Sequence, residues 1–185
     1  RKFGARHNFC PNSPTFLEYA PLLARKLAER YGAHPALVAW HINNEYGGSC
    51  YCERCEAAFR GWLGRRYATL DALNEAWCTG FWGHTFSDWD QVVAPSLLSE
   101  HLTGEKTVFQ GITLDYYRFM SDSILGCYTA ERDAIRRAAP GVPITTNLMG
   151  TFKGLDYFSW AKELDVVSWD SYPSIDTPTS EVAMR

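Results

Sequence analysis

Apolar side chains recur at helical spacing along most of this chain. The spacing predicts helices over residues 16–31, 55–67, 71–77, 112–138 and 158–164. The first helix has clear end signals, because Ser13 and Pro14 are typical of a helix start and Gly32 is typical of a helix end.

Three short segments lack helical spacing and are predicted to be strands, at 37–45, 144–147 and 165–170. The run from Leu37 to Trp40 is apolar with little alternation, which is typical of a parallel strand buried on both faces. Because strands alternate with helices, the chain is expected to form βα units with a parallel sheet, an α/β fold. Residues 78–110 have no clear pattern, and their Trp and Phe content favours an ordered excursion over a linker.

Polar or aromatic residues follow each predicted strand: Asn44-Glu45, Asn147, and Trp169-Asp170-Ser171-Tyr172. In an α/β barrel the active site lies at the carboxyl ends of the strands, so these side chains are expected to share one face. A closed barrel needs eight strands and typically about 250 residues. We therefore expect residues 1–185 to form part of a single (β/α)8 TIM-barrel domain.

The composition fits one globular domain or a piece of one, with 185 residues, 46% hydrophobic residues and a formal net charge of -3. The near-neutral charge argues against a nucleic-acid partner, whose phosphates need clustered Lys and Arg. No apolar run reaches the roughly 18 residues of a membrane helix, so no membrane partner is expected. The chain lacks an initiator Met and an apolar leader, so we interpret it as an internal fragment. Its thiols favour a reducing compartment, and the parent protein is expected to be cytoplasmic.

Glu45 is the candidate catalytic residue. A carboxyl group at a strand end suits a general acid that protonates a glycosidic oxygen, and Asn44 beside it would bond a sugar hydroxyl. Glycoside hydrolysis also needs a second carboxylate, about 5–5.5 Å away for retention or 6.5–9.5 Å for inversion. The alternative is a buried Glu45 that an Arg such as Arg6 neutralises, without chemistry. Arg6 could reach the acid or a sugar hydroxyl, or it could lie on the surface.

Cys50, Cys52 and Cys55 place three thiols within six residues, which suits one metal ion better than disulfides. Cys10 is the best fourth ligand, because its loop and the Cys50 loop are expected to be neighbours on one face of the barrel. Four thiolates would form a closed structural zinc site. The weaker ligand candidates are His7 and His41. Disulfides remain the alternative for an oxidising compartment, and Cys78 and Cys127 are expected to be buried small apolar residues.

Five motifs together resemble glycoside hydrolase family 42, whose members are mostly bacterial β-galactosidases. They are Arg-His-x-x-Cys-Pro-Asn-Ser-Pro at 6–14, Trp-His-Ile-Asn-Asn-Glu-Tyr-Gly at 40–47, the cysteine cluster at 50–55, Thr-Thr-Asn-Leu-Met-Gly at 145–150, and Ser-Trp-Asp-Ser-Tyr-Pro at 168–173. The motifs occur in the family's order and span nearly the whole chain.

The resemblance implies an arc of the barrel that runs from the loop after strand three to just past strand six. It implies that Glu45 is the acid/base residue and that Arg6 and Asn44 hold galactose. It also implies a zinc site of four cysteine thiolates, which are Cys10, Cys50, Cys52 and Cys55. The residues implied to line the same cleft are Asn147, Trp169, Asp170 and Tyr172.

The family nucleophile, a Glu on strand seven, would fall beyond Arg185, and no carboxylate in the chain matches its motif. The resemblance therefore implies a retaining β-galactosidase as the parent, often a trimer in this family, and an inactive segment. One alternative hypothesis is a non-catalytic, zinc-stabilised module that binds sugar or a protein partner. Another is a thiol-redox or metal-transfer protein, which would need an exposed thiol of low pKa.

Overall fold

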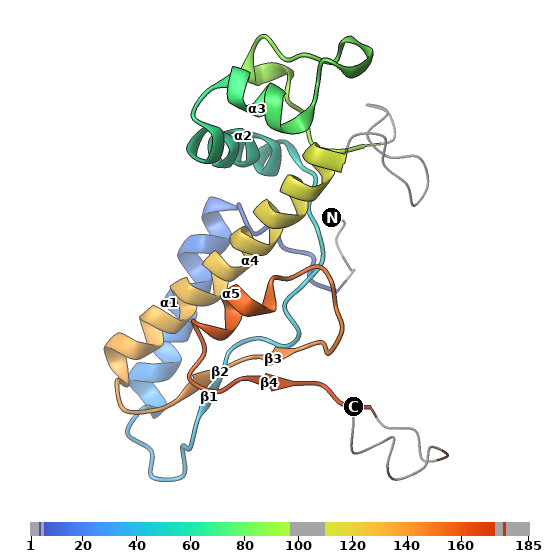
Figure 1. Ribbon diagram of the computed structural model, residues 1–185. Coiled ribbons are helices and arrows are strands. Elements are labelled where there is room, and N and C mark those ends of the chain that lie inside the picture. The colour runs from blue at the N-terminus through green and yellow to red at the C-terminus, as the bar shows by residue number, and fades with distance from the viewer. Residues whose placement is uncertain (1–3, 5, 97–109, 173–175, 177–185) are drawn as a thin grey trace.

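The computed structural model describes residues 4, 6–96, 110–172 and 176. Its α-helices are α1 (Pro14–Tyr31), α2 (Glu53–Tyr67), α3 (Leu70–Trp77), α4 (Gln110–Ala138) and α5 (Tyr157–Ala161). Two 3₁₀ turns are η1 (Phe81–Gly83) and η2 (Trp89–Gln91). The strands are β1 (Trp40–His41), β2 (Ile144–Thr145), β3 (Asn147–Leu148) and β4 (Ser168–Trp169). Figure 1 shows α1 alongside the long helix α4, with the strands at one end of the molecule.

The predicted helices are present, with shifted ends. The Ser13 hydroxyl accepts the N–H of Phe16 at 3.4 Å, which confirms the predicted start of α1. The helix predicted at 158–164 is shorter, because it begins at Tyr157 and ends at Ala161. The Asp156 carboxylate caps its first turn by accepting the N–H of Phe158 at 3.1 Å. The predicted excursion contains η1 and η2, and its residues 97–109 lie outside the described part of the chain.

The strands are parallel, as predicted. Trp40 pairs with Ile144 and His41 with Thr145, which joins β1 to β2. Further along, Asn147 pairs with Ser168, and Leu148 with Trp169, which joins β3 to β4. The segment 144–148 therefore lies between the other two, and the carboxyl ends of all three point the same way.

Two expectations for the strands are wrong. The strand predicted at 37–45 is too long, because Asn43 and Glu45 have φ of 55° and 51° and so leave the extended conformation. The apolar run from Leu37 to Trp40 is also not buried on both faces, since Val38, which precedes β1, is 83% exposed. Ile42, Ile144 and Leu148 pack against helical side chains. Among the described residues, the helices therefore cover one face of the strands.

The apolar side chains form two clusters joined by α4. One packs β-strand residues against α1, α4 and α5, with Ile144 and Trp160 fully buried. The other packs α2 and α3 against the first turns of α4, with Phe59 and Tyr116 fully buried. In Figure 1, α4 runs from one group of elements to the other. Among the described helices, none has the length and apolar character needed to cross a membrane.

Candidate functional site

Glu45 lies just past the carboxyl end of β1 and forms an ion pair with the guanidinium of Arg6. The Glu45 side chain is 12% exposed, whereas the Arg6 side chain is 60% exposed. A nearly buried carboxylate therefore has a cation beside it that reaches solvent. The pair brings together two of the residues predicted from the sequence.

Asn147 connects the ends of the three strand segments. Its Oδ1 accepts the backbone N–H of Glu45 at 3.0 Å, and it lies 3.0 Å from His41 Nε2. Its Nδ2 donates to Asp170 Oδ1 at 2.6 Å. One amide side chain thus contacts the residues that follow β1 and β4.

Asp170 completes this group. A hydrogen bond with the Glu45 carboxyl and a second from Asn147 hold the pKa of Asp170 below its usual range, and the charges of Arg6 and His41 act in the same direction. The second oxygen, Asp170 Oδ2, is buried. The strand ends therefore bring two carboxyl groups, those of Glu45 and Asp170, to one site, where Asn147 connects the two residues.

The backbone is unusual at the same place. His7, Asn43 and Glu45 all have φ between 51° and 55°, a region that residues other than glycine rarely adopt. Local hydrogen bonds hold this turn, because Asn43 Oδ1 accepts the N–H of Asn44 at 2.8 Å and His7 Nε2 lies 3.2 Å from the Asn44 carbonyl oxygen. Disfavoured backbone conformations of this kind concentrate at functional sites.

The other predicted binding residues lie at the same strand ends but outside this contact network. Asn44 and Tyr172 are exposed, the latter by 84%. Trp169 is exposed and lines a groove with Leu148 and Tyr157. Their roles in binding stay predictions.

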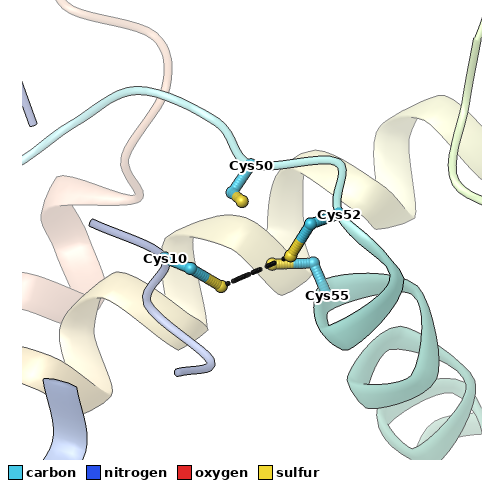
Figure 2. Close-up of side chains that lie close together, drawn as sticks. All are labelled: Cys10, Cys50, Cys52 and Cys55. Atoms are coloured by element: carbon cyan, nitrogen blue, oxygen red, sulfur yellow. Dashed lines mark hydrogen bonds between the residues drawn. The ribbon is translucent and has the colours of Figure 1, made fainter. Parts of the chain in front are cut away.

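The cysteine cluster is confirmed as a structural unit. The sulfur atoms of Cys10, Cys50, Cys52 and Cys55 all lie within 4.8 Å of one another. Figure 2 shows Cys10 on the N-terminal segment facing the loop and first turn of α2, which carry the other three. Cys10 Sγ lies 3.4 Å from Cys55 Sγ and 3.6 Å from Cys52 Sγ. These separations are close to the roughly 3.8 Å between two sulfur ligands of a tetrahedral zinc ion. They far exceed the roughly 2.05 Å of a disulfide, and none of the six cysteines is in a disulfide. Cys127 is buried as expected, but Cys78 is exposed, so the expectation for Cys78 is wrong.

Neighbouring groups fix the cluster in place. Asn12 Nδ2 donates to Cys55 Sγ at 3.4 Å, and the buried Tyr116 hydroxyl donates to the Cys50 carbonyl at 2.6 Å. Burial raises the pKa of the Cys10 thiol to about 11. Burial opposes the shift at Cys52, but hydrogen bonds from the Cys55 backbone and from nearby thiols lower its pKa to about 7. The donor set fits a metal ion that binds thiolates.

The two histidines that were weaker ligand candidates lie away from the sulfur atoms. His7 contacts Asn44, and His41 contacts Asn147. Sequence reasoning missed the place of His41 beside the acid.

The chain is similar to known proteins of one family. The β-galactosidase model of glycoside hydrolase family 42 matches residues 1–185. Over 184 residues the chain is 63% identical to β-galactosidase BgaP of Planococcus sp. (strain L4), covering 100% of this chain and 27% of the relative. It is 62% identical to β-galactosidase BgaA of Planococcus sp. (strain 'SOS Orange'), with the same two coverages.

A solved structure matches as well. The β-galactosidase from Bacillus circulans sp. alkalophilus superimposes with a TM-score of 0.93 at 64% identity, over 100% of this chain and 27% of that one. The chain thus spans about a quarter of the length of the relatives that it matches. Because the family model covers every residue, the chain belongs to glycoside hydrolase family 42, the β-galactosidases.

Proposed function

We propose that the whole protein is a retaining β-galactosidase that hydrolyses terminal, non-reducing β-D-galactosides, with Glu45 as the acid/base residue. The observation that carries the proposal is the nearly buried Glu45 carboxyl at the end of a parallel strand, in contact with the exposed cation of Arg6. Family membership supports the substrate class. In this mechanism Glu45 first protonates the glycosidic oxygen and then activates water.

The nucleophile is proposed to lie outside these 185 residues. Asp170 is the other carboxylate at these strand ends, and its Oδ1 accepts Nδ2 of Asn147. A retaining pair needs about 5–5.5 Å between the carboxyls to accommodate the sugar. Asp170 is an Asp that follows β4, whereas the family nucleophile is a Glu on strand seven, so the 185-residue chain alone is expected to be inactive.

The remaining features follow from the same proposal. Arg6 and Asn44 would hold the galactose, and the three strand segments would be an arc of a (β/α)8 barrel, from the loop after strand three to just past strand six. The four thiolates would hold a structural zinc ion, because a fourth protein ligand leaves no open position for catalysis. We further propose that the whole protein is a cytoplasmic homo-oligomer, a trimer.

The test uses the full-length protein and an activated aryl β-galactoside. Glu45→Ala should stall after galactosyl transfer, and azide should release a β-galactosyl azide, because azide needs no general base. Glu53→Ala is the matched control, since Glu53 is exposed at the start of α2 and should retain wild-type rates. The catalytic proposal fails if the wild type is inactive, or if Glu45→Ala is as active as an active wild type. Sugar binding without turnover would then favour the non-catalytic, zinc-stabilised module.

A further inference from the structure

Asn147 contacts the Glu45 backbone, His41 and Asp170 with a single amide group. We infer that Asn147 is a positioning residue that holds Glu45 through its backbone N–H, and that Asp170 orients the Asn147 amide for this role. The inference rests on the proposed function, because it assumes that Glu45 must be aimed at a leaving-group oxygen.

The first step is the backbone of Glu45. Its φ of 51° is disfavoured for a residue with a side chain, so a specific contact must select it. The bond from the Glu45 N–H to Asn147 Oδ1, 3.0 Å long, fixes the orientation of that peptide group. The direction of the Glu45 side chain depends on this peptide, because φ rotates the side chain relative to the N–H.

The second step is the orientation of the amide. An Asn side chain has an acceptor end and a donor end, and reversing it would place its NH₂ group against the Glu45 N–H. The ionised Asp170 prevents this reversal, because its Oδ1 needs a donor and receives Nδ2 at 2.6 Å. The depressed pKa of Asp170, caused first by the Glu45 carboxyl and then by Asn147, agrees with an acceptor that stays charged. The carbonyl end is left to face β1, where it meets both Glu45 and His41.

The experiment compares two substrates in the full-length enzyme. A general acid matters for a poor leaving group such as phenol, and much less for an activated one such as 2,4-dinitrophenol. Asn147→Ala should lower kcat/KM by about 10²-fold for phenyl β-galactoside, the cost of a misplacement of about 1 Å, but only a few-fold for the dinitrophenyl substrate. Leu148→Ala is the matched control, because it creates a cavity at the buried neighbour while keeping the Asn147 amide and its hydrogen bonds, so it should affect both substrates equally.

A second variant covers the case in which Asn147→Ala does not fold. Asn147→Asp keeps the shape and the acceptor oxygens but loses the donor to Asp170. Its activity on the phenyl substrate should recover towards wild type as the pH falls, because the protonated acid can donate to Asp170 again. The other titratable or charged groups facing this position are Glu45, His41, Arg6 and Tyr157, and they are the same in the wild type, which serves as the reference. A pH profile parallel to that of the wild type would overturn the inference.

A readout without catalysis separates this inference from the proposed function. Hydrogen exchange should show the Glu45 amide protected in the wild type and in Leu148→Ala, but exchanging fast in Asn147→Ala. If the wild type lacks β-galactosidase activity, the proposed function fails, while the exchange result still judges the positioning role. Equal losses on both substrates, or a Glu45 amide that stays protected in Asn147→Ala, would refute that role.

Discussion

Arg6 places a mostly exposed cation against a nearly buried carboxylate, and under the proposed function its guanidinium would bind a sugar hydroxyl. Arg6→Ala in the full-length protein should lower kcat/KM on an aryl β-galactoside by about 10- to 10²-fold, because a hydrogen bond to a charged group contributes about 1.5–3 kcal/mol. Arg6→Lys should lose less, since the charge remains without the planar guanidinium. Arg25→Ala, which removes an exposed cation from α1, is the control. Unchanged kinetics in Arg6→Ala would count against its role in the site.

Tyr116 tests how the cysteine loop is held. Its hydroxyl is buried and donates to the Cys50 carbonyl at 2.6 Å. Tyr116→Phe should destabilise the protein by about 1–3 kcal/mol, because the Cys50 carbonyl loses its buried donor. Thermal unfolding measures the loss, and Tyr117→Phe, at an exposed position of the same helix, should have almost no effect. A Tyr116→Phe variant as stable as the wild type would show that the loop does not depend on this bond.

Single residues were predictable where chemistry is local to the sequence. The four thiols were found from their spacing and loop positions, and the sulfur atoms do converge. The contact of Asn147 with the Glu45 N–H was not predictable, because it joins residues 102 positions apart and depends on the register of two strands. The same holds for the place of His41 beside Asn147 rather than beside the cysteines.

Among the elements, the helices were predicted better than the strands. A helix carries its own periodic stripe and end signals, as Ser13 does for α1. The strand ends are set by turns that the apolar pattern does not show, such as the left-handed residues Asn43 and Glu45. Burial on both faces was wrong, because cover for a strand comes from neighbours and not from its own sequence.

Asp165 provides a prediction for how α4 is joined to the sheet. Its carboxylate pairs with Arg136 of α4 and accepts the N–H of Ile144 at 2.7 Å. The Arg136 hydrogen bond, opposed by some burial and helped by Ile144, lowers the pKa of Asp165 below its ordinary 3.8. A lowered pKa stabilises the fold above the ordinary value, and this stability is lost as the pH falls through the folded-state pKa.

We therefore expect Asp165→Asn to destabilise the protein at pH 7 by at most about 1 kcal/mol, since the side chain is partly exposed and solvent screens the pair. Urea unfolding at pH 7 and near pH 3 checks this, because the difference from wild type should shrink at the lower pH. Asp133→Asn, whose carboxylate pairs with the adjacent Arg132 on the same helix, is the control. A difference that persists near pH 3 would contradict the ion-pair explanation.

At the scale of the whole molecule, the four thiols tie the N-terminal segment to the start of α2. The purified full-length protein should contain one zinc ion per chain by elemental analysis. Cys55→Ser should lose the metal and lower the unfolding temperature by several degrees, because metal binding adds directly to folding free energy. Cys78→Ser should keep both, since Cys78 is exposed and lies outside the cluster. A wild type without metal, or with metal retained in Cys55→Ser, would refute the zinc site.

The exposed apolar surface of the 185-residue chain carries the last prediction. Large apolar side chains of α1 are substantially exposed, including Tyr19 at 58% and Leu23 at 62%. In the described part of the sheet, β1 and β4 each pair on one side only. Such faces and edges favour association. Residues 1–185 expressed alone should bind an apolar dye and show a mass above the 21.0 kDa monomer by light scattering. Leu23→Lys should weaken that association, because it places a charge on the exposed face. A monomer that binds no dye would instead show that these exposed apolar side chains do not drive association.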